Sequence, residues 1–110
     1  MSIQKFTTPS LLSMALPALD APGLAPRAGV DFSMPGKEGV DIGVWESEPG
    51  SFERTIKEGE IMHILAGEAS FTTVDGEHIE FGAGDTLVFS PNTLGRWTVK
   101  STLRKFYVIL

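Results

Sequence analysis

The sequence predicts a single all-β domain, an antiparallel barrel or jelly roll, on three observations. After residue 38, short apolar runs alternate with turn residues at the spacing of a sandwich or barrel. Twelve glycines and seven prolines among 110 residues suit a fold with many turns. No segment with a helical period separates the runs, so a parallel sheet is not expected. A chain of this length can bury one core but not two.

Eight or so short strands are expected, over residues 40–44, 52–57, 61–65, 69–74, 78–81, 86–89, 97–99 and 105–110. The run 61–65 is apolar on both faces apart from His63, which is typical of a strand buried between two layers. Asp75-Gly76 separates two alternating runs and is a dipeptide favoured in short hairpins. The tight turns between the runs favour antiparallel pairing.

Residues 1–37 are expected to form an irregular N-terminal arm, and residues 38–110 the barrel. The arm holds prolines at positions where a long helix or a central strand would be broken, at Pro9, Pro17, Pro22, Pro26 and Pro35. Its apolar stretch from Leu11 to Leu19 is too short to span a bilayer. We interpret it as a segment that covers the barrel or a partner subunit, not as a secretion signal or a membrane anchor.

The charge balance and the residue types exclude several classes of function. Fourteen acidic and nine basic residues give a formal charge of −5, and without a basic cluster the chain is not expected to bind nucleic acid. Because it has no cysteine, disulfides, thiolate catalysis and cysteine-based metal sites are excluded. This composition fits a cytoplasmic protein. No arrangement resembles a catalytic triad or a phosphate-binding loop.

Two stretches resemble the motifs of the cupin family. Glu60–Gly67 resembles the end of the first cupin motif, and Gly84–Pro91 resembles the start of the second. The resemblance implies a cupin-type double-stranded β-helix, that is, a jelly-roll barrel. Further segments resemble the single-domain cupins related to (S)-ureidoglycine aminohydrolase, namely Gly43–Glu46, Pro49–Phe52, Trp97 and Arg104–Ile109.

The metal-binding residues that this resemblance would imply are mostly missing. Metal-binding cupins carry a His-x-His pair before the glutamate and a further histidine after the second motif. Of these ligands only Glu60 is present, since residues 53 and 55, residues 54 and 56, and residues 95–97 include no histidine. A lone carboxylate is a poor site for a transition metal. We therefore expect no metal or other cofactor, with a divalent metal at Glu60 as the alternative.

Five residues are candidates for a ligand site in the barrel. Glu60 is expected to face the interior, bound either to a ligand or to an arginine. Arg54 and Arg96 could hold a carboxylate or ureido group, or form surface ion pairs. Trp97 suits a pocket wall or the core. His63 lies three residues after Glu60, so it faces outward unless a bulge intervenes, and it is either a packing residue or a pocket residue.

Three functions follow from this pattern. The first is a metal-free module that binds a small polar molecule in the barrel. The second is a metal-dependent hydrolase or isomerase acting on a ureide-like compound. The third is a structural dimer whose barrel is plugged by side chains. A homodimer is expected in any case, because Phe106–Leu110 is apolar on both faces and would be hazardous as an unpaired edge.

Overall fold

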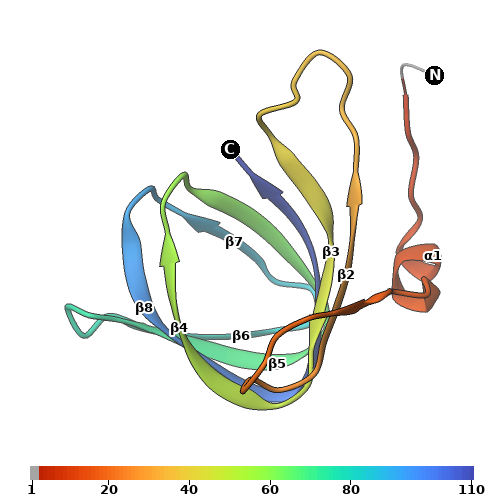
Figure 1. The fold of residues 1–110 in the computed structure, drawn as a ribbon. Coiled ribbons are helices and arrows are strands. Elements are labelled where there is room, and N and C mark those ends of the chain that lie inside the picture. The colour runs from red at the N-terminus through yellow and green to blue at the C-terminus, as the bar shows by residue number, and fades with distance from the viewer. Residues whose placement is uncertain (1–2) are drawn as a thin grey trace.

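Eight strands and one short helix form the computed structural model, which describes residues 3–110 (Figure 1). The elements are α1 (Thr8–Ser13), β1 (Ala18–Leu19), β2 (Arg27–Phe32), β3 (Asp41–Ser47), β4 (Gly50–Ile56), β5 (Glu60–Thr73), β6 (His78–Gly82), β7 (Thr86–Phe89) and β8 (Thr93–Ile109). All strand pairings between them are antiparallel. The all-β prediction is confirmed.

Two long strands, β5 and β8, pair with each other and run through both layers of the fold. At one end they lie between β3 and β7, and at the other end between β4 and β6. The sequence pattern predicts two separate strands within each of them, at residues 61–65 and 69–74 in β5 and at residues 97–99 and 105–110 in β8. The structure instead bends β5 through register shifts between Ile64 and Ala69, with Gly67 at a φ of +89°.

The space between the layers holds an apolar core with Trp97 at its centre. The indole contacts aromatic rings from several strands, those of Trp45, Phe52, Phe71, Phe81 and Phe89. Trp97 itself is fully buried. A separate, smaller cluster lies outside the barrel, where Leu11 of α1 packs with Val44 and Leu65. Figure 1 shows α1 beside β2 and β3 on this outer side.

Residues 3–37 contain more regular structure than the expected irregular arm. β2 pairs with β3 along its whole length, so it is a strand of the sheet. Helix α1 begins after Thr7, whose side chain accepts a hydrogen bond from the Ser10 amide in a capping box. Arg104 fixes the end of the helix by donating to the carbonyl groups of Leu11, Leu12 and Met14. Pairing with β3 and hydrogen bonds from Arg104 therefore stabilise regular secondary structure in a stretch where the prolines disfavour it.

The C-terminal run lies in the middle of the sheet. Residues 106–109 of β8 pair with β3 on one side and with β5 on the other. The run is therefore not an unpaired edge, and the reason given above for a homodimer does not hold, while the homodimer itself stays a prediction. Within residues 3–110, no helix is long and apolar enough to cross a membrane.

Candidate functional site

A cavity of about 280 Å³ opens between the layers, bordered by β2, β3 and the end of β8 on one side and by β4 on the other. Inward-facing positions of these strands line it, because side chains alternate along a strand. Its charged lining residues are Arg27, Asp31, Asp41, Arg54, Glu60 and Lys105. Its aromatic walls are Trp45, Phe52 and Tyr107. Six charged groups in a cavity of this size make it the candidate site.

The centre of the site is a buried carboxylate held by two cations. The side chain of Glu60 is 0% exposed. Arg54 Nη2 donates to Glu60 Oε1 at 2.5 Å, and Lys105 Nζ donates to Oε2 at 2.7 Å. The Lys105 ammonium also lies 5.0 Å from the Trp45 ring centre and 5.2 Å from that of Trp97. Glu60 and Lys105 are buried while Arg54 is partly exposed, so the ion pair between Glu60 and Lys105 has the most fixed geometry.

Burial and the nearby Arg54 charge lower the pKa of Lys105 to about 8, although Glu60 opposes the shift. The pKa of an unfolded lysine lies near 10.5. At pH values between about 8 and 10.5, residue 105 therefore binds more protons in the unfolded chain than in the folded protein. The free energy of unfolding is therefore expected to rise as the pH increases from about 8 to 10. Urea unfolding across this range should show the rise in the natural protein and lose it in Lys105→Met. Parallel curves for the two proteins would contradict the assignment.

Arg27, which the sequence analysis did not select, also borders the cavity. Its guanidinium carbon lies 4.0 Å above the Phe52 ring centre and 5.5 Å from that of Trp45. Burial and the neighbouring Arg54 lower the pKa of Arg27. In the sequence, the only indication that Arg27 belongs to the site is that Arg27 and Asp31 share one face of an alternating run. The surrounding prolines make this run hard to recognise as a strand.

The other end of the cavity is acidic. Tyr107 donates its hydroxyl proton to Asp31 Oδ1 at 2.8 Å, and Asp41 lies on the neighbouring strand β3. Burial, the hydrogen bond to Asp31 and the nearby acids raise the pKa of Tyr107 above its usual range. The phenol therefore remains a hydrogen-bond donor at ordinary pH. Gly43 makes room for it, since a Cβ there would lie 2.7 Å from the Tyr107 hydroxyl.

The structure brings two of the five predicted site residues together. Glu60 and Arg54 line the cavity. Trp97 lies in the core beneath it, and its Nε1 has no hydrogen-bond partner among the described residues. Arg96 lies outside the cavity and forms an ion pair with exposed Glu53 at 3.3 Å. His63 is exposed on the outer side of β5, where its Nδ1 lies 2.9 Å from the Thr86 hydroxyl.

The residues present do not fit the metal site of a metal-binding cupin. Both oxygens of Glu60 are engaged by cationic side chains, which would repel a metal ion. Among residues 3–110 no three histidine, cysteine or acidic side chains are grouped so as to hold one.

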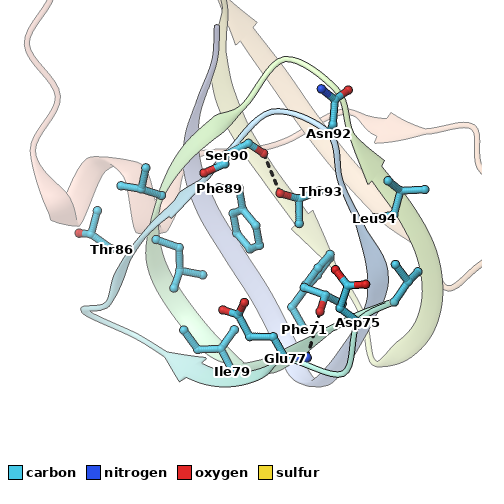
Figure 2. Close-up of a pocket in the computed structure, with 14 residues that line it drawn as sticks. Phe71, Asp75, Glu77, Ile79, Thr86, Phe89, Ser90, Asn92, Thr93 and Leu94 are labelled. Carbon is cyan, nitrogen blue, oxygen red and sulfur yellow. Dashed lines mark hydrogen bonds between the residues drawn. The ribbon is translucent and has the colours of Figure 1, made fainter.

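A second hollow, of about 570 Å³, opens between β6, β7 and the start of β8 (Figure 2). Figure 2 shows Phe71 and Phe89 pointing into it, with Asp75 and Glu77 on the hairpin beside it. It is larger than the first cavity, but its polar side chains are exposed or only partly buried. Because it has no buried charged cluster, we assign the candidate site to the smaller cavity.

The chain matches the EutQ-like cupin domain family over residues 36–107. It is similar to a solved DUF861 family protein from Thermotoga maritima, with 31% identity, 61% of this chain and 76% of that chain covered, and a TM-score of 0.60. The EutQ protein of Clostridium difficile has 18% identity, covers 89% of this chain and 81% of its own, and gives a TM-score of 0.74. A cupin superfamily protein from Desulfitobacterium hafniense has 19% identity, coverages of 74% and 76%, and a TM-score of 0.60. No curated protein matches the chain.

Proposed function

The chain belongs to the EutQ-like cupin domain family, and from this premise we propose that it binds a small polar molecule in the barrel cavity. The observation that carries the proposal is the Glu60–Arg54–Lys105 cluster, buried in the wall of an open cavity. The ligand is held by these fixed charges and by Arg27, without the metal ion of metal-binding cupins.

The energetics of the cluster support a binding role. A buried ion pair often contributes less to stability than apolar residues of the same volume would. A chain under selection for stability alone would fill this place with apolar side chains, as it does around Trp97. Small ligands bind in cavities that combine apolar walls with a few fixed polar groups. The cavity has both, since Trp45 and Phe52 form its walls.

The competing function is a metal-dependent hydrolase or isomerase acting on a ureide-like compound, as the resemblance to ureidoglycine aminohydrolase implies. It requires ligands beyond Glu60, and the two cations on Glu60 weigh against it. A plugged barrel, the structural alternative, is disfavoured by the open cavity. The homodimer and the cytoplasmic location remain predictions from the sequence.

Metal analysis and thermal shift together test the proposed function. Purified protein is expected to contain no stoichiometric manganese, iron, nickel or zinc. At least one member of a panel of ureides, amino acids and organic acids is expected to raise the melting temperature by several degrees, with or without EDTA. One bound metal ion per chain would favour the hydrolase instead. A panel without any shift would favour the structural role.

A further inference from the structure

Arg27 has hydrogen-bonding capacity that the protein does not use. Its Nε and Nη2 atoms are buried and have no hydrogen-bond partner within residues 3–110. A buried donor without a partner destabilises the folded state, more strongly when the group is charged. Such an arrangement is therefore expected to serve a purpose other than stability.

The two unpartnered atoms define the shape of what they would bind. Nε and Nη2 lie on one edge of the guanidinium plane, where they present two nearly parallel N–H bonds. This fork matches the two oxygens of a carboxylate, which accept both bonds at once. The ring of Phe52, 4.0 Å from the guanidinium carbon, occupies one face of the plane and therefore does not engage the N–H bonds on its edge.

The charges around Arg27 favour the binding of an anionic ligand over a neutral or cationic one. Arg54 and Lys105 lie in the same part of the cavity, and both already share the single negative charge of Glu60. Asp31 is four residues from Arg27 on β2, about 13 Å along the strand, and Tyr107 donates to it. This end of the cavity therefore has more positive than negative charge.

We propose that the cavity binds the carboxylate group of a small organic acid and that Arg27 is the residue that grips it. The inference rests on the proposed function, since it names the ligand class for the same cavity. Arg27 borders the cavity. Because its Nε and Nη2 atoms are buried, the proposed contact requires the side chain to rotate about its torsions until the Nε–Nη2 edge faces the open space. The remainder of the acid packs on the walls formed by Trp45 and Phe52.

Calorimetric titration with matched acids and amides tests the ligand class. The probes are butyrate with butyramide, N-carbamoylglycine with its primary amide, and inorganic phosphate. At least one acid is expected to bind ten or more times more tightly than its amide, and more tightly than phosphate. An amide that binds as well as its acid, or phosphate that binds more tightly, would overturn the carboxylate assignment while leaving a ligand-binding cavity. Absence of binding by every probe would count against the proposed function as well.

Variants of two arginines test the role of Arg27. Arg27→Met is expected to weaken binding of the acid at least tenfold and to leave the amide within twofold. Arg96→Met is the matched control, because it removes the same side chain from outside the cavity, and it should change neither affinity. Arg27→Lys keeps the charge without the fork and is expected to restore less than half of the lost free energy of binding. Unchanged acid affinity in Arg27→Met or full rescue by lysine would refute the proposed grip, and circular dichroism establishes that each variant is folded.

Discussion

Glu60→Gln is expected to lower the free energy of unfolding by about 3–5 kcal/mol, the typical cost of breaking a buried ion pair. The substitution keeps the shape of the side chain but removes its charge. Lys105, with a side chain only 3% exposed, would then be a buried cation without its counter-ion, next to Arg54. Urea unfolding followed by tryptophan fluorescence measures the loss, since Trp97 and Trp45 lie next to the cluster.

Two further variants establish the cause of this loss. Glu53→Gln removes the same charge from an exposed pair, with Glu53 at 82% exposure, and is expected to cost less than about 1 kcal/mol. In the double variant Glu60→Leu with Lys105→Met, apolar side chains replace both buried charges, and most of the lost stability should return. A loss below about 1 kcal/mol for Glu60→Gln, or no recovery in the double variant, would show that the ion pair does not carry the effect.

Gly67→Ala is expected to cost at least about 3 kcal/mol, because two independent effects combine there. The residue has a φ of +89°, which disfavours any side chain. In addition, a Cβ at this position would lie 2.2 Å from the carbonyl oxygen of Thr102 and 2.8 Å from the Cα of Leu103. Both are backbone atoms of β8, so the bend of β5 against β8 would have to open.

Gly84→Ala is the matched control for Gly67→Ala. Gly84 has a similar φ of +93°, but a Cβ there would meet no atom within 4 Å. Its substitution carries only the conformational cost, about 1–2 kcal/mol. Denaturant unfolding of both variants should therefore separate the close contact from the backbone strain. Equal losses in the two proteins would mean that the contact with β8 adds nothing.

The parts of the fold that the sequence predicts are those set by local interactions. The Asp75-Gly76 hairpin is present, with Gly76 at a φ of +95°, and the runs around it form β6 and the end of β5. The strand β2 and the capped helix α1 were not predicted. Their stability comes from β3 and from Arg104, which are distant in sequence. The continuity of β5 through its bend also depends on a partner, β8.

The sequence by itself predicted an all-β barrel from its glycine turns and its alternation, and the resemblance to cupin motifs implied an inward-facing Glu60 without the usual histidines. Glycine turns and alternation are local, so their consequences can be derived from neighbouring residues. Which charged side chains lie together in the cavity was decided only by the tertiary structure. Arg27, Arg54, Glu60 and Lys105 come from four different strands, and sequence spacing gives no register between strands. The same register places Arg96 outside the barrel and Trp97, its immediate neighbour, in the core, because adjacent residues of a strand face opposite sides.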